Sequence, residues 1–260
     1  MESGQKGISR LSAISIRADG SDRAEIISQL LFGEHYTVLD VKEKWIRIEN
    51  HIDGYKGWID RKQFHAISDA YFEQINNSTY KICTDLVASI LYHKNLVPVT
   101  LGCIIPISTN EIFKVEEHLG FNGEAKSLSE RRDFEYLKGI SMKYLNAPYL
   151  WGGKSPFGID CSGFVQVVFR ICGYLLLRDT FQQVKQGKEV INFADAIPGD
   201  LLFFRNSERK VTHVGILLEN QKVIHASGKV RIDLIDENGI FNVEQNRYTH
   251  YLSDIRRVLV

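Results

Sequence analysis

Short stretches in which apolar and polar residues alternate mark the N-terminal part of the chain. Residues 39–41, 45–48 and 55–59 each repeat with period two, which is typical of half-buried strands. The Asp53-Gly54 dipeptide before the third stretch is a hairpin turn signal. Closely spaced short strands with turns between them predict a small all-β barrel over residues 1–68.

The order of these stretches resembles a bacterial SH3-like domain, and residues 54–58 (Gly-Tyr-Lys-Gly-Trp) are the most specific part of the likeness. Residues 69–130 are less regular. Residues 97–107 have a strand-like pattern with prolines near both ends, which is typical of edge strands. We predict a second, degenerate SH3-like domain here, followed by a polar linker over residues 123–130.

The pattern changes to helical spacing in the C-terminal part of the chain. Residues 134–144 have an amphipathic helical pattern, and residues 161–172 carry apolar positions at i, i+3, i+4 and i+7. Asp160 is a good N-cap and Gly173 a good stop signal for the second helix. Strand patterns then follow over residues 201–204, 212–218, 222–228 and 252–259. A helix followed by an antiparallel meander predicts an α+β domain over residues 131–260.

Composition and charge exclude several classes of protein. The 260 residues carry 32 basic and 32 acidic side chains, so a nucleic-acid partner is not expected. No apolar run is long enough to span a bilayer, so no membrane partner is expected either. Residues 1–6 lack the basic and apolar regions of a signal peptide. We expect a cytoplasmic monomer, or a periplasmic or secreted protein if a leader has been removed.

The four cysteines form no C-x-x-C pair, so neither a metal site nor a cofactor is expected. Cys161 differs from the other three because it falls at the first turn of the predicted buried helix. Free N–H groups and the positive end of the helix dipole gather there, which favours a thiolate nucleophile. The alternative is an inert buried thiol.

A cysteine nucleophile needs a base, and two histidines occur twelve residues apart on neighbouring predicted strands, His213 and His225. A hairpin loop centred on Glu219 would place the two rings opposite each other on one face of the sheet. A two-residue turn at residues 220–221 would place them on opposite faces. The sequence leaves both registers open.

Five motifs resemble the NlpC/p60 cell-wall cysteine peptidases over residues 134–260. In order along the chain they are PYLWGG at 148–153, GIDCSGF at 158–164, PGDLLFF at 198–204, HVGI at 213–216 and VIHASG at 223–228. The resemblance implies a compact papain-like α+β domain. It also implies that Cys161 is the nucleophile, His213 the general acid–base and His225 the residue that orients His213, with Tyr149 as a second oxyanion donor beside the Cys161 backbone N–H.

The subgroup with N-terminal SH3-like domains implies a substrate as well. Its enzymes cleave the γ-D-glutamyl-L-diamino acid bond of murein tri- or tetrapeptides with a free N-terminal L-alanine, releasing L-Ala-D-Glu during cell-wall peptide recycling. The positions that match its substrate-binding residues are Glu34, Tyr55, Asp160, Ser162 and Thr180. The alternatives are a papain-like amidase or acyltransferase, for which no apolar membrane-facing segment is visible, and a non-catalytic peptidoglycan-binding protein.

Overall fold

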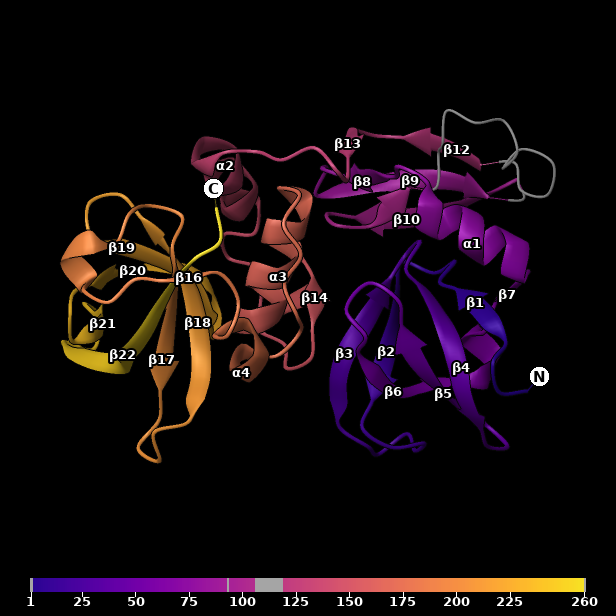
Figure 1. Ribbon diagram of the computed structural model, residues 1–260, viewed down its shortest axis with the longest axis horizontal. Helices are drawn as coiled ribbons and strands as arrows, with labels where there is room; N and C mark the ends of the chain where they lie inside the picture. The colour runs from indigo at the N-terminus through magenta and orange to yellow at the C-terminus, as the bar shows by residue number, and fades with distance from the viewer. Residues whose placement is uncertain (1, 93, 106–118, 260) are drawn as a thin grey trace. The chain divides into compact units, whose positions relative to one another are not determined.

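The computed structural model describes residues 2–92, 94–105 and 119–259 (Figure 1). The chain divides into two compact units. Unit 1 comprises residues 1–130 together with a short return segment, residues 151–156. Unit 2 comprises residues 131–150 and 157–260. No helix among the described residues is long and apolar enough to cross a bilayer.

Unit 1 begins with a seven-stranded antiparallel sheet that curls into a small barrel. The sheet order is β3-β2-β6-β5-β4-β1-β7. Its strands are β1 (Lys6–Ile8), β2 (Ala13–Arg17), β3 (Ile26–Leu31), β4 (His35–Val41), β5 (Trp45–Asn50), β6 (Lys56–Asp60) and β7 (Ala66–Ile67). The alternating apolar side chains meet inside, among them Ile14, Val38 and Ile48. The predicted turn is present, since Gly54 has φ +68°, which glycine adopts without strain. The SH3-like barrel predicted from the period-two pattern is therefore confirmed.

The remainder of unit 1 contains a helix and two small sheets. A single 3₁₀ turn, η1 (Arg61–Gln63), precedes β7, and α1 (Asp69–Asn77) follows it. The sheets are β10-β9-β12 and β11-β8-β13. Their strands are β8 (Lys81–Cys83), β9 (Val87–Tyr92), β10 (Asn95–Thr100), β11 (Ile104–Ile105), β12 (Leu119–Asn122) and β13 (Ala125–Ser127), and β14 (Lys154–Ser155) lies in the return segment.

The structure differs from the sequence prediction at two places in residues 97–130. The single strand expected over residues 97–107 is divided into β10 and β11 by a turn at Gly102, which has φ +83°; residues 106 and 107 lie outside the described part of the chain. The polar stretch 123–130, expected as a linker, includes β13, which pairs with β8.

Unit 2 combines helices with a seven-stranded antiparallel sheet of order β16-β22-β17-β18-β19-β20-β21 (Figure 1). An additional pairing of β21 with β22 curls the sheet back on itself. The strands are β16 (Lys188–Glu189), β17 (Leu201–Arg205), β18 (Val211–Leu218), β19 (Lys222–Ser227), β20 (Lys229–Ile235), β21 (Gly239–Asn242) and β22 (Arg247–Arg257), with β15 (Gly158–Ile159) outside this sheet. The helical elements are α2 (Phe134–Lys143), α3 (Cys161–Ile171), α4 (Thr180–Gln183) and the 3₁₀ turn η3 (Phe193–Asp195). The α+β prediction is confirmed, although the pattern analysis missed β16, β20 and β21.

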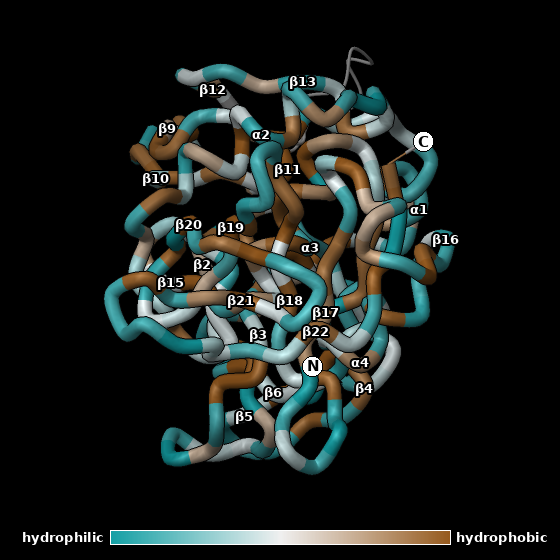
Figure 2. The backbone as a smooth tube through the Cα atoms, turned by 90° about the vertical axis from the view of Figure 1, so that its left-hand side faces the viewer, coloured by the Kyte–Doolittle hydropathy of each residue, from teal (hydrophilic) through white to brown (hydrophobic). Residues whose placement is uncertain are grey.

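Helix α3 is the buried centre of unit 2. Every residue from Cys161 to Ile171 is buried, and α3 packs against β18 and β19. The hydropathy colouring in Figure 2 shows many apolar positions in the helices and strands and mostly hydrophilic connecting loops. The Asp160 side chain accepts a hydrogen bond from the Gly163 N–H at 2.7 Å, as an N-cap does. The sequence therefore sets both the start of α3 and the position of Cys161.

Candidate active site

Cys161 is the first residue of α3 and is 5% exposed. Burial has the largest effect on the pKa of its thiol and raises it, whereas the backbone N–H groups of Val214 and Ser162 and the charge of Arg178 lower it. Burial, followed by the negative charge of Asp160, raises the pKa of the Cys161 thiol to about 12. The helix start does lower this pKa through the Ser162 N–H, as expected, but desolvation of the thiolate outweighs that effect and the net shift is upwards. The neutral thiol is the resting form.

The hairpin that carries His213 and His225 has a register that neither sequence alternative described. His225 lies opposite Gly215, and a three-residue turn, 219–221, connects β18 to β19. The two histidines therefore share a face, as the first alternative required, but they are diagonal neighbours. The missing side chain at Gly215 makes room, since a Cβ there would come within 3.1 Å of the His225 Cβ. The ring nitrogens His213 Nε2 and His225 Nδ1 lie 2.8 Å apart.

The row of polar groups continues beyond His225. His225 Nε2 lies 3.0 Å from Asp233 Oδ2, and Arg231 donates from Nη2 to Asp233 Oδ1 at 2.9 Å. His250 stacks on His213 with ring centroids 4.2 Å apart. The sequence analysis missed Asp233, Arg231 and His250. A signal was available for the first two, because residues 230–234 alternate strictly between apolar and charged side chains, which indicates a strand.

The environments of His213 and Tyr149 keep both side chains uncharged. Burial, and then the neighbouring His225 and His250, hold the pKa of His213 well below its usual value. Burial, followed by electrostatic interaction with the ionisable groups of Cys161 and Asp160, raises the pKa of Tyr149 to about 12. His213 is therefore a free base at neutral pH, and the Tyr149 hydroxyl remains a hydrogen-bond donor.

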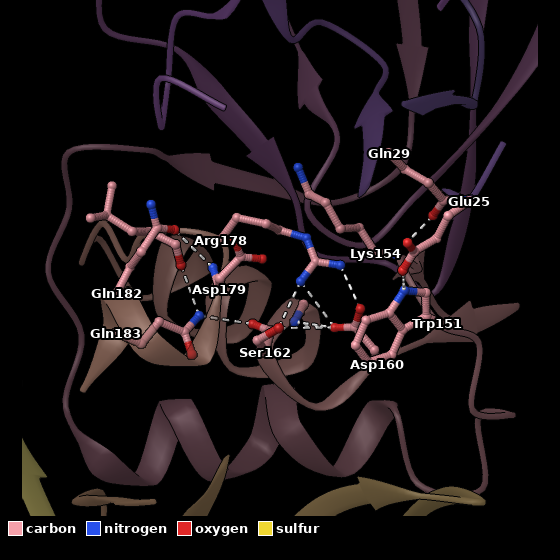
Figure 3. Close-up of polar contacts among 12 residues, drawn as sticks. Glu25, Gln29, Trp151, Lys154, Asp160, Ser162, Arg178, Asp179, Gln182 and Gln183 are labelled. Atoms are coloured by element: carbon pink, nitrogen blue, oxygen red, sulfur yellow. Dashed lines mark hydrogen bonds and ion pairs between the residues drawn. The ribbon is translucent and has the colours of Figure 1, made fainter. Parts of the chain in front are cut away.

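The residues that flank Cys161 belong to a buried ion-pair network (Figure 3). Arg178 donates to both carboxylate oxygens of Asp160, at 3.0 and 2.6 Å, and to the Ser162 hydroxyl at 2.7 Å. Gln183 of α4 donates to the Ser162 carbonyl at 3.0 Å. The Thr180 hydroxyl donates to the Val211 carbonyl at 3.3 Å, on the strand that carries His213. The network fixes the start of α3 and the approach to β18.

The two unit 1 candidates occupy different environments. Glu34 is fully buried, and both of its carboxylate oxygens accept hydrogen bonds from the Lys154 ammonium, at 2.9 and 3.1 Å. Asn50 donates to the same carboxylate at 3.3 Å. The return segment is also fixed by Trp151, which donates to Glu25, and by the Lys154 backbone N–H, which donates to Gln29 at 2.8 Å (Figure 3).

Tyr55 is partly exposed and lies immediately before β6, after the 53–54 turn. Its backbone N–H donates to the Asp53 carboxylate at 3.1 Å. Within the described ranges, no group of three or more His, Cys, Asp or Glu side chains is arranged to hold a metal ion.

A buried cysteine starts a helix that packs against β18, and β18 carries a histidine bonded to a second polar group. This arrangement defines a cysteine peptidase site on a papain-like α+β scaffold. Comparison with known proteins agrees with this class. Residues 146–251 match the NlpC/P60 family, and residues 16–64 match the bacterial dipeptidyl-peptidase SH3 domain.

Two curated relatives extend the match along the chain. Gamma-D-glutamyl-L-lysine dipeptidyl-peptidase of Bacillus subtilis (strain 168) is 30% identical over 220 residues, which cover 77% of this chain and 72% of the relative. Dipeptidyl-peptidase 6 of Lysinibacillus sphaericus is 26% identical, covering 86% of this chain and 89% of the relative. The crystal structure of an NlpC/P60 family protein from Bacillus cereus ATCC 10987 has the same fold, with a TM-score of 0.82, 20% identity and coverage of 98% of this chain and 100% of the other. The chain belongs to the NlpC/P60 family and is a cysteine peptidase.

Proposed function

We propose that this peptidase hydrolyses the γ-D-glutamyl-L-diamino acid bond of murein peptides with a free N-terminal L-alanine, releasing L-Ala-D-Glu during cell-wall peptide recycling. Relatives from Bacillus subtilis and Bacillus cereus carry the name gamma-D-glutamyl-L-lysine dipeptidyl-peptidase, which supports this choice of bond. The observation that carries the proposal is the 2.8 Å contact between His213 Nε2 and His225 Nδ1. The residue after His213 is Val214, whose backbone N–H interacts with the Cys161 thiol.

The reaction starts with Cys161 as a neutral thiol and His213 as a neutral imidazole. As the substrate carbonyl approaches, the Cys161 proton passes to His213 and the sulfur attacks the carbonyl carbon. The Cys161 backbone N–H and the Tyr149 hydroxyl donate hydrogen bonds to the developing oxyanion. The carbon–nitrogen bond then breaks, and His213 gives its proton to the leaving amine.

Water completes the cycle. His213 takes a proton from a water molecule, and the resulting hydroxide attacks the thioester carbonyl. The carbon–sulfur bond breaks, the acid product leaves and Cys161 regains a proton. His225 holds the His213 ring in place through both halves of the reaction.

We further propose that Asp160, Ser162 and Thr180 of unit 2 recognise the amino end of the substrate. Glu34 and Tyr55 of unit 1 are separate candidates for the same role. The physical reason is the charge of the substrate's ammonium group, which requires a carboxylate. Glu34 and Asp160 supply carboxylates, and each is already bonded to one cation of the chain, Lys154 or Arg178. An incoming ammonium therefore has to share a carboxylate, and a carboxylate has about four lone-pair positions with which to do so.

The test compares free and N-acetylated L-Ala-γ-D-Glu-L-Lys as substrates. Wild-type protein should cleave only the free peptide, and Cys161→Ala should cleave neither. Cys172→Ala is the matched control, since Cys172 is another buried thiol, at the end of the same helix. It should keep the wild-type rate. Cleavage by Cys161→Ala contradicts the nucleophile, whereas equal rates on both peptides contradict only the recognition of the amine.

A further inference from the structure

The buried polar row does not end at His225, and its far end consists of residues that the peptidase chemistry above does not use. Asp233 is 8% exposed and lies on β20, directly opposite Val223 of β19. Its carboxylate accepts from His225 on one side and from Arg231 on the other. All of these groups lie within unit 2.

We propose that Asp233 is a positioning residue that sets the tautomer of His213 through His225. The inference rests on the proposed peptidase mechanism, because it concerns the proton that His213 must be free to accept. It requires no contact between Asp233 and the substrate.

The argument begins at the carboxylate, where an ionised side chain can only accept hydrogen bonds. His225 Nε2, 3.0 Å from Asp233 Oδ2, must therefore carry the hydrogen and donate it. Within this proposal His225 is a neutral ring, which carries one N–H, so its Nδ1 is left as an acceptor. Asp233 thereby makes His225 Nδ1, the nitrogen that faces His213, a hydrogen-bond acceptor.

The same donor–acceptor argument applies to His213. His213 Nε2 lies 2.8 Å from the acceptor His225 Nδ1, so Nε2 must donate. The second nitrogen of His213, Nδ1, is then the lone pair that can take the Cys161 proton. The opposite tautomer would place a hydrogen on Nδ1 and remove the base, although every ring kept its position.

Arg231 keeps the Asp233 carboxylate ionised, so that it can only accept hydrogen bonds. Its Nη2 donates to Asp233 Oδ1 at 2.9 Å and its Nε lies 2.8 Å from Oδ2, so the carboxylate faces a positive charge. Protonated Asp233 could donate a hydrogen bond to His225 and reverse the direction of the whole row. An ion pair that prevents this protonation defines a single direction of donation from His213 to Asp233.

Nitrogen NMR of histidine-labelled protein tests the proposal without any substrate. In wild-type protein we expect His213 and His225 both to be protonated at Nε2. In Asp233→Asn we expect a mixture of His213 tautomers, because an amide can either donate or accept. A wild-type spectrum with His213 protonated at Nδ1 overturns the proposal, whether or not the protein cleaves murein peptides.

Kinetics separate positioning from ordinary structural support. Asp233→Asn should lower kcat by about 10- to 100-fold with little change in KM, the size of effect known for the hydrogen-bond partners of metal-bound histidines. Asp236→Asn is the matched control, since Asp236 lies just beyond the same strand and accepts from Tyr248 and from the backbone, away from the histidine row. It should keep the wild-type kcat. Unchanged kcat in Asp233→Asn, or an equal loss in Asp236→Asn, overturns the proposal.

Discussion

Replacement of Arg178 by methionine should both destabilise unit 2 and slow the enzyme. Arg178 is 1% exposed and holds both oxygens of Asp160, which is 5% exposed. Removal of one partner from such a pair leaves an uncompensated buried charge, which costs about 3–5 kcal/mol of unfolding free energy. Because Asp160 caps the helix that begins at Cys161, the nucleophile should also move. A displacement of the order of 1 Å can cost about 100-fold in rate.

Two assays check this expectation. Denaturant unfolding, followed by a signal from unit 2, should give the loss in stability for Arg178→Met. The double variant Asp160→Asn with Arg178→Met should lose less than the two single variants together, because it leaves no unpaired charge. Steady-state kinetics without denaturant, at the pH optimum of the wild-type enzyme, should give the loss in kcat.

A second ion pair in the same unit supplies the control. Arg257 donates to both carboxylate oxygens of Asp200, and Asp200 is 1% exposed. Arg257→Met should therefore also destabilise the protein, but it should leave kcat unchanged. If Arg178→Met is as stable and as active as wild-type protein, or if Arg257→Met loses kcat equally, the link from Arg178 to the nucleophile is refuted.

Three further predictions follow from other groups. Glu34→Gln removes the carboxylate that neutralises buried Lys154, so unit 1 should lose about 3–5 kcal/mol in denaturant unfolding. Adding Lys154→Met should restore much of the loss, and additive effects would contradict the pairing. Tyr149→Phe should lower kcat by about 100- to 1,000-fold with little change in KM, and an unchanged kcat would remove the Tyr149 hydroxyl from the oxyanion site. Burial lowers the pKa of His35 and of His250 to about 4, so the unfolded chain binds more protons between pH 6.5 and 4. Stability should be greatest above pH 6.5 and fall towards pH 4, by at most about 3 kcal/mol for each histidine, whereas a flat profile would contradict neutral burial.

Local patterns in the sequence predicted much of unit 2. The apolar period of α3 and its Asp160 cap specify the helix start, because both depend on residues only a few positions apart. The strands β17, β18 and β19 were recognised for the same reason. The hairpin register between His213 and His225 was not, since it depends on whether the turn contains two residues or three, and that choice is made by pairing along the whole hairpin.

The missed contacts connect residues that are remote in the sequence or oppose a local trend. Lys154 and Glu34 are 120 positions apart. No local pattern relates a lysine that follows two glycines to a glutamate between two strands of the barrel. Asp233 reaches His225 only because β20 pairs with β19. The pKa of Cys161 differs from the sequence prediction for another reason: a helix start is visible in the sequence, but the burial that opposes its effect depends on the packed fold.

The most direct test of the central claim is mass spectrometry of the products formed from defined murein tri- and tetrapeptides in water enriched in heavy oxygen. Hydrolysis through a thioester on Cys161 predicts L-Ala-D-Glu as the released acid, with the heavy oxygen in its new γ-carboxyl group, and no release by Cys161→Ala. Cleavage at any other bond, or undiminished release of labelled L-Ala-D-Glu by Cys161→Ala, would contradict the account.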